Sequence, residues 1–337
     1  MRLRTSHPSG PGYRRIKQGR GFSFVDVDGQ PITDEQERRR LRELVIPPAW
    51  REVWVCPWPN GHVQAVGTDD AGRRQYLYHP QFRAQQEQAK HERVLEVAVA
   101  LPEVRRRAMR DLGGRGLTRE RVLALGVRLL DLGFFRVGNR QYTDTNDSYG
   151  LTTVRRDQVT CRGGEISFDY PAKSGRQYCR ELVDDESFAV VRALLRRQGG
   201  SDRLMEYWEG RHWHPVEGND LNAHLHNLSG HPITTKDFRT WHATVLAAVA
   251  LAVSVQAAGT SKAARQRAAS RAVREVANYL GNTPAVCRAS YINPRLFELF
   301  DEGVTIADAL PDLGVRGRRG PLATQGPVEE AVLRLLS

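Results

Sequence analysis

The sequence predicts an α+β protein in which a small antiparallel β domain precedes a larger, mainly α-helical domain with one β-hairpin. Short β-like runs separated by turn signals fill residues 21–80. From about residue 84 onward, apolar residues recur at helical spacing. A length of 337 residues is enough for two domains with sizeable cores. We place the domains at residues 1–85 and 86–337.

The first domain contains four predicted strands, and each is bounded by a turn signal or a proline. A helix is expected between the first two strands, in EQERRRLRELV, and it must end near Pro47-Pro48 because a residue before proline disfavours helical backbone. The four runs are GFSFVDV, VWVCPW, HVQAVG and RQYLYHP.

The second domain begins with helices expected at 84–110 and 118–133, the latter closed by Gly133. A hairpin is expected around Gly163-Gly164, between TTVRRDQVTC and EISFDYPA. The Gly/Arg-rich segment 313–326 has the composition of a loop. Further helices are expected at about 184–198, 218–229, 234–257, 260–280 and 327–336.

Membrane insertion is not expected. The most apolar stretch, Ala243 to Val255, is too short and too Ala-rich to span a bilayer, and we interpret it as a buried helix. The start, MRLRTSHPSG, has no apolar region of the secretory type behind its basic residues. Four dispersed cysteines without a CxxC pair argue against a structural zinc and against a disulfide framework. These features predict a cytoplasmic protein.

Charge points to a polyanionic partner. The formal net charge is +11, the basic residues are mostly arginine, and the isoelectric point is about 9.8. Arginine binds phosphate in a planar, bidentate geometry. Two acid-free basic runs, within residues 1–20 and 262–274, suit contact with a long polyanion such as DNA. The alternative is a basic surface that only maintains solubility.

The motif inventory excludes several classes of enzyme. The chain has no HExxH motif, no DxD cluster and no GxxxxGK[ST] loop. We therefore expect no cofactor, no catalytic metal ion and no use of ATP.

Five segments, in chain order, resemble the compact type IB topoisomerases of poxviruses and bacteria, from Gly21 to about Glu302. The resemblance implies a catalytic domain related to the tyrosine recombinase fold and a monomer that closes as a clamp around double-stranded DNA. It also implies nucleoid association and ATP- and metal-independent relaxation of supercoils, by transient single-strand cleavage through a 3′-phosphotyrosine. The segments are LVIPPAWREVWVCPWPNGHVQAVGTDDAGRRQYLYHP, FFRVGN, YPAKSGR, KDFRTWHAT and LGNTPAVCRASYINP.

The resemblance assigns the nucleophile to Tyr291, the two phosphate-clamping arginines to Arg136 and Arg239, and the general acid to Lys173. A phenol suits reversible nicking, because its phosphoester roughly preserves the energy of the broken bond. Asn282 stands where poxviral relatives carry histidine, and it can donate a hydrogen bond but no charge. Without the resemblance, Tyr291 is more simply a packing residue and Arg136 a helix-end cap.

DNA contacts are expected in the first domain at RRQYLYHP, which resembles the strand that lies in the major groove in poxviral relatives. Alternatively, the two tyrosines, at i and i+2, share one sheet face and simply pack. The expected DNA-binding residues are Arg73, Arg74, Gln75, Tyr76 and Tyr78, together with Lys262 and Arg265 of the second basic run.

Two other functions remain open. A tyrosine site-specific recombinase shares the Arg, Lys, Arg, Tyr chemistry, but it usually carries histidine three residues before the second arginine, where this chain has Lys236. That difference, with the IPPAW and RRQYLYHP segments, favours a topoisomerase. A non-enzymatic DNA-binding protein would also account for the basic composition.

Overall fold

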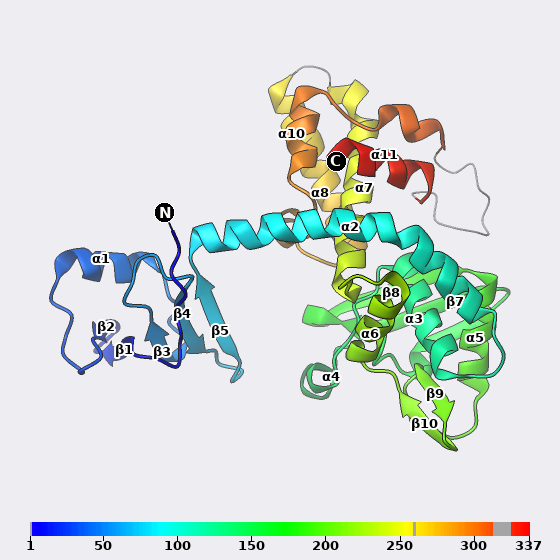
Figure 1. Ribbon diagram of the computed structural model, residues 1–337, viewed down its shortest axis with the longest axis horizontal. Helices are drawn as coiled ribbons and strands as arrows, with labels where there is room; N and C mark the ends of the chain where they lie inside the picture. The colour runs from blue at the N-terminus through cyan, green and yellow to red at the C-terminus, as the bar shows by residue number, and fades with distance from the viewer. Residues whose placement is uncertain (1, 259–260, 313–324) are drawn as a thin grey trace. The chain divides into compact units, whose positions relative to one another are not determined.

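The structure, a computed structural model, describes residues 2–258, 261–312 and 325–337 and contains two compact units, one up to Lys90 and one from His91 (Figure 1). Helix α2 (Pro80–Leu112) contains this boundary, and the division expected after residue 85 falls in the same helix. Most of the predicted 313–326 loop lies outside the described residues. The structure describes Gln325 and Gly326 of this segment, and Gln325 is buried.

The first unit is a five-stranded antiparallel sheet with one helix, α1 (Glu35–Glu43). The order is β2-β1-β3-β4-β5. Strand β1 was not predicted, because its sequence YRRIKQ is dominated by charge; it is specified by pairing with β2 and β3. The strands are β1 (Tyr13–Gln18), β2 (Gly21–Val25), β3 (Arg51–Val55), β4 (Val63–Thr68) and β5 (Arg74–Tyr78).

Helix α1 covers this sheet and completes its core. The Asp34 side chain caps the helix by accepting a hydrogen bond from the Glu37 backbone N–H at 2.7 Å. Leu41 is buried against Val53 and Val55. The antiparallel sheet and helix predicted for this part of the chain are confirmed.

The second unit is mainly helical, as predicted, and α7, α8, α10 and α11 gather in one part of it (Figure 1). The expected helices appear within a few residues of their predicted bounds, and side-chain caps at Thr118, Asp184 and Ser261 explain several starts. The helices are α3 (Arg119–Gly133), α4 (Arg140–Asn146), α5 (Asp185–Arg196), α6 (Gly218–Ser229), α7 (Thr235–Ala258), α8 (Lys262–Leu280), α9 (Pro284–Ser290), α10 (Arg295–Glu302) and α11 (Pro327–Leu336).

The predicted hairpin is part of a larger sheet. Strands β6 (Val159–Arg162), β7 (Glu165–Ala172) and β8 (Arg176–Val183) form three antiparallel strands in sequence order. The strand expected from TTVRRDQVTC is shorter than predicted, since Arg156–Gln158 is a 3-10 turn. A second, unpredicted hairpin joins β9 (Glu206–Glu209) to β10 (His212–Pro215).

Helix α7 is the central helix of this unit. By length and composition alone, its segment Thr235–Val255 could cross a membrane, because the helix extends the predicted apolar stretch, Ala243 to Val255, toward the N-terminus. However, 67% of the apolar window is buried inside the protein. The helix also carries buried Asp237 and Arg239. Among the described residues it is the one stretch of this kind, and its burial is that of a core helix.

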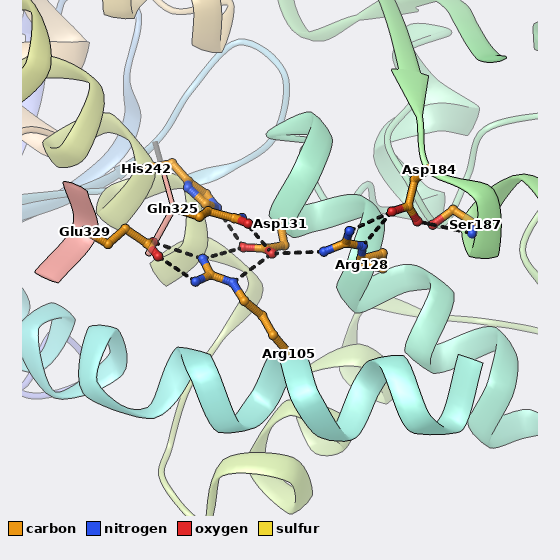
Figure 2. Close-up of polar contacts among 8 residues, drawn as sticks. All are labelled: Arg105, Arg128, Asp131, Asp184, Ser187, His242, Gln325 and Glu329. Atoms are coloured by element: carbon orange, nitrogen blue, oxygen red, sulfur yellow. Dashed lines mark hydrogen bonds and ion pairs between the residues drawn. The ribbon is translucent and has the colours of Figure 1, made fainter. Parts of the chain in front are cut away.

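A buried polar network joins α2, α3, α7 and α11 (Figure 2). The Arg105 guanidinium donates to both carboxylate oxygens of Asp131, at 2.9 Å each, and to both of Glu329, at 2.6 and 2.9 Å. Gln325 donates to Asp131 at 3.0 Å. Burial raises the pKa of the Asp131 carboxyl, but the charges and hydrogen bonds of Arg105 and His242 together outweigh burial and hold the pKa well below its usual range.

We expect Asp131→Ala to lower the free energy of unfolding by about 3–5 kcal/mol, because it leaves part of the buried Arg105 guanidinium without its acceptor. Urea denaturation measures the loss. The control is Asp157→Ala, which removes the exposed partner of Arg155 and should have little effect. Similar losses in the two variants would contradict a special role for the buried network.

Candidate active site

Arg136 is placed by a sharp turn at the end of α3. Phe134 ends the helix in the left-handed conformation, with φ 59° and ψ 29°, and Phe135 is fully buried. The Leu151 backbone N–H then donates to the Arg136 carbonyl at 2.8 Å. Gly150 approaches this loop so closely that a Cβ atom there would lie 2.5 Å from the Gly138 nitrogen. The loop of Arg136 is therefore held by its backbone.

The Arg136 side chain reaches the end of α8. Its Nη2 donates to the Gly281 carbonyl at 3.2 Å and to Asn282 Oδ1. The Asn282 carbonyl accepts a further hydrogen bond, at 3.0 Å, from Arg176 at the start of β8. Two arginines from different segments thus fix the Asn282 loop.

Arg239 lies on the second turn of α7 and is buried, with 4% of its surface exposed. Its guanidinium donates to the Phe134 carbonyl and, at 2.7 Å, to the Leu280 carbonyl. Burial lowers the pKa of Arg239, and the charge of Arg136 lowers it further. The two arginines are therefore close neighbours in a site of high positive charge.

Tyr291 follows α9 and is held through its backbone. Its N–H donates to the Cys287 carbonyl at 3.0 Å, and the Thr244 hydroxyl of α7 lies 3.3 Å from its carbonyl oxygen. The ring is 9% exposed, and its centroid lies 5.5 Å from the guanidinium carbon of Arg239.

Nearby positive charges lower the pKa of the Tyr291 phenol. Burial by itself raises the pKa of this group. The guanidinium groups of Arg239 and Arg136 outweigh burial, and Lys236 adds to their effect, so the pKa lies below its ordinary value. A lower pKa makes the phenolate, the nucleophilic form, more accessible near neutral pH.

Lys173 occupies the short 3-10 turn Lys173–Gly175 between β7 and β8, and its side chain is exposed. It lines a cavity of about 330 Å³ together with Arg136, Arg239 and Tyr291. Asn282 adjoins this cavity through its bond to Arg136. Four segments that are distant in sequence thus bring a phenol, two guanidinium groups and an ammonium group to one cavity.

Comparison with known proteins identifies the family of the chain. The family described as "Eukaryotic DNA topoisomerase I, catalytic core" matches residues 79–299, and "Bacterial DNA topoisomerase IB, N-terminal domain" matches residues 21–69. The chain belongs to the type IB DNA topoisomerase family. It is therefore an enzyme of the type I topoisomerase class.

Individual relatives are named DNA topoisomerase 1B or DNA topoisomerase 1. The DNA topoisomerase 1B of Acanthamoeba polyphaga mimivirus is 29% identical over 86% of this chain and 87% of the viral protein. The DNA topoisomerase 1 of Daucus carota is 28% identical over 38% of this chain and 15% of the plant protein. That of Schizosaccharomyces pombe is 25% identical over 72% of this chain and 28% of the yeast protein.

Three residues at this candidate site were not predicted from the sequence. Lys236 lines the cavity and lowers the pKa of Tyr291; its position one helical turn before Arg239 was a usable signal. Arg176 and Thr244 act through backbone contacts to Asn282 and Tyr291. Both residues stand in segments that carry the resemblance, YPAKSGR and KDFRTWHAT, but the contacts themselves could not be predicted, because each joins distant segments.

The predicted DNA-contacting strand of the topoisomerase is β5. Tyr76 and Tyr78 lie on one face, their rings stacked at 6.0 Å, and they are 45% and 43% exposed. They are therefore exposed rather than packed into the core. Arg73 and Gln75 both donate to the Asp69 carboxylate, at 3.0 and 2.9 Å, while Arg74 is exposed.

The second basic run forms part of α8, where Lys262 is exposed. Arg265 donates instead to the carbonyls of Phe300 and Asp301 at the end of α10. Its guanidinium therefore caps a helix, a role that the sequence did not predict. Within the described ranges, no cluster of three or more His, Cys, Asp or Glu side chains could hold a metal ion.

We expect the Tyr291 phenol to lose its proton at lower pH than an ordinary tyrosine, and Arg239→Gln to raise its pKa by removing a positive charge. NMR of protein labelled with ¹³C at the tyrosine Cζ atoms measures the titration, and Tyr291→Phe identifies the resonance. Arg288→Gln is the control, because Arg288 stacks on Phe297 instead. An unchanged Tyr291 titration in Arg239→Gln would contradict the electrostatic assignment.

Proposed function

We propose that the chain relaxes supercoiled double-stranded DNA by cutting one strand through a transient 3′-phosphotyrosine bond at Tyr291 and then resealing it. The observation that carries this proposal is the convergence of Tyr291, Arg136, Arg239 and Lys173 around one cavity. These groups supply a nucleophile, two cations for the phosphoryl oxygens and a proton donor. The chemistry needs no ATP and no metal ion.

In the cleavage step, the Tyr291 oxygen attacks the phosphorus atom after its proton has passed to solvent. The new bond joins phosphorus to the tyrosine oxygen, and the bond from phosphorus to the 5′-oxygen breaks. Lys173 gives its proton to the departing 5′-oxygen. In resealing, the 5′-oxygen attacks the phosphorus atom as its hydroxyl proton returns to Lys173. The bond from phosphorus to the Tyr291 oxygen breaks, and the phenolate takes up a proton from solvent. Torsion in the DNA drives rotation between the two steps.

Buried donors without partners support the phosphate site. Arg239 Nε and Asn282 Nδ2 are buried and find no hydrogen-bond partner in the described part of the chain. A buried donor left unpaired costs about 1–3 kcal/mol. The non-bridging oxygens of a phosphodiester are acceptors that would satisfy both groups. Nη1 and Nη2 of Arg239 each donate one hydrogen bond to a carbonyl, and these two bonds orient its guanidinium before the phosphate binds.

Binding to duplex DNA is proposed for both units. The exposed Tyr76 and Tyr78 suit contact with base edges, and exposed Arg74 and Lys262 suit contact with phosphates. All the proposed catalytic groups belong to one chain, which supports a monomer that closes around DNA as a clamp. The order Arg136, Lys173, Arg239, Tyr291 supports a fold relationship to tyrosine recombinases.

We expect both positive and negative supercoils to relax in EDTA without ATP. Tyr291→Phe should still bind duplex DNA but should form no covalent adduct, because only the nucleophilic hydroxyl is lost. Plasmid relaxation and denaturing gels with labelled DNA measure these outcomes, and Tyr279→Phe, at the end of α8, is the matched control. Strict dependence on magnesium, or an adduct with Tyr291→Phe, would contradict the proposal. Exchange between two sites without relaxation of single plasmids would indicate a recombinase.

We expect Lys173→Ala to slow cleavage by about 10²–10⁴-fold, the usual contribution of a general acid. A substrate with sulfur in place of the bridging 5′-oxygen should restore most of this rate, since a thiolate leaves without protonation. Single-turnover adduct formation measures both rates. Arg239→Ala should be rescued much less, because its proposed partners are the non-bridging oxygens. No rescue of Lys173→Ala would mean that Lys173 positions the phosphate instead.

A further inference from the structure

Two residues that follow Arg239 in α7 connect the active site to the buried polar network. Trp241 is 1% exposed, and its indole N–H donates to Glu329 Oε1 of α11 at 2.8 Å. His242 Nε2 lies 3.3 Å from Asp131 Oδ1 of α3. The turn of α7 that follows Arg239 is therefore contacted by carboxylates from two other helices. Figure 2 shows the contact of Asp131 with His242.

Asp131 also adjoins the turn that receives Arg239. It lies three residues before Phe134, whose carbonyl accepts a hydrogen bond from Arg239. The Phe134 ring packs edge to face on His242, with the ring centroids 4.7 Å apart. The end of α3 and the beginning of α7 are thus joined by the hydrogen bond from Arg239 to Phe134 and also by the contacts of His242 with Asp131 and Phe134.

Arg105 links the two carboxylates. Its guanidinium makes two hydrogen bonds to Asp131 and two to Glu329. A planar guanidinium bound at both edges fixes the directions as well as the distances of its partners. Movement of Glu329 would therefore be transmitted to α3 through Arg105 and to α7 through Trp241.

We propose that Glu329 is a positioning residue for the active site, which acts through Trp241 and Arg105 to hold Arg239 in place beside Tyr291. The inference rests on the proposed function, in which Arg239 binds the scissile phosphate. It gives the C-terminal helix α11 a part in the cleavage step.

Apolar packing alone would not supply this alignment. Val328, Val332 and Leu336 are buried and recur at four-residue spacing along α11. Such a stripe stabilises the helix on the core but is non-directional. A buried ion pair often adds little stability compared with apolar groups of similar size. Directional bonds to Glu329 thus account for the orientation of α11, and its apolar stripe accounts for its attachment.

The test compares Glu329→Gln with Val332→Ala in the full chain. Glu329→Gln keeps the size of the side chain but removes the charge that binds Arg105, whereas Val332→Ala removes only apolar packing. We expect Glu329→Gln to slow single-turnover cleavage by up to about 100-fold, with little change in DNA affinity. Its pH–rate profile should move to higher pH, because a displaced Arg239 no longer lowers the pKa of Tyr291. Val332→Ala should lower the melting temperature but leave the pH–rate profile unchanged.

A wild-type rate and pH profile in Glu329→Gln would overturn the inference. So would a loss of rate that follows the loss of thermal stability equally in both variants. If Glu329→Gln does not fold, Trp241→Phe replaces it, since this change removes the indole donor and keeps an aromatic ring. Failure of the wild-type protein to form an adduct, or an adduct formed by Tyr291→Phe, would count against the proposed function instead.

Discussion

The site depends on a buried guanidinium that is held by the ends of two helices. Arg239 donates to the Phe134 carbonyl at the end of α3 and to the Leu280 carbonyl at the end of α8. Terminal carbonyls lack partners within their own helices and carry the negative end of the helix dipole. They can therefore stabilise a buried cation without neutralising it by a full negative charge. This contact brings α3, α7 and α8 to one point.

The same constraint gives the site its positive character. The side chain of Arg136 also reaches the C-terminal end of α8, where it donates to the Gly281 carbonyl. Two guanidinium groups thus lie close together beside the phenol of Tyr291, and together they lower its pKa. Positive groups fixed before a substrate arrives can stabilise developing negative charge without reorganising.

The second unit holds two arginines, Arg105 and Arg239, by different kinds of acceptor. Arg105 is buried against Asp131 and Glu329, so its charge is matched and its role is to join helices. Arg239 is bound by neutral carbonyls and keeps an unpaired N–H. The first arrangement gives rigidity and the second leaves capacity for an anion. The two arrangements meet along α7, because Trp241 and His242, which contact the network of Arg105, follow Arg239 within one helical turn.

The sequence by itself determined the longer helices of the second unit and the α1-containing sheet of the first, because apolar spacing, caps and turns are local signals. The short helices α4, α9 and α10 were not predicted. Through motif resemblance the sequence also indicated the residues of the site; patterns alone would have left Tyr291 as a packing residue. Strands β1, β9 and β10 were missed because short polar strands form only through their partners. Tertiary structure alone decided that Tyr291, Arg136, Arg239 and Lys173 line one cavity, and that Arg265 caps a helix. These outcomes depend on contacts between residues far apart in the chain, whose distances and directions are set only when the helices pack.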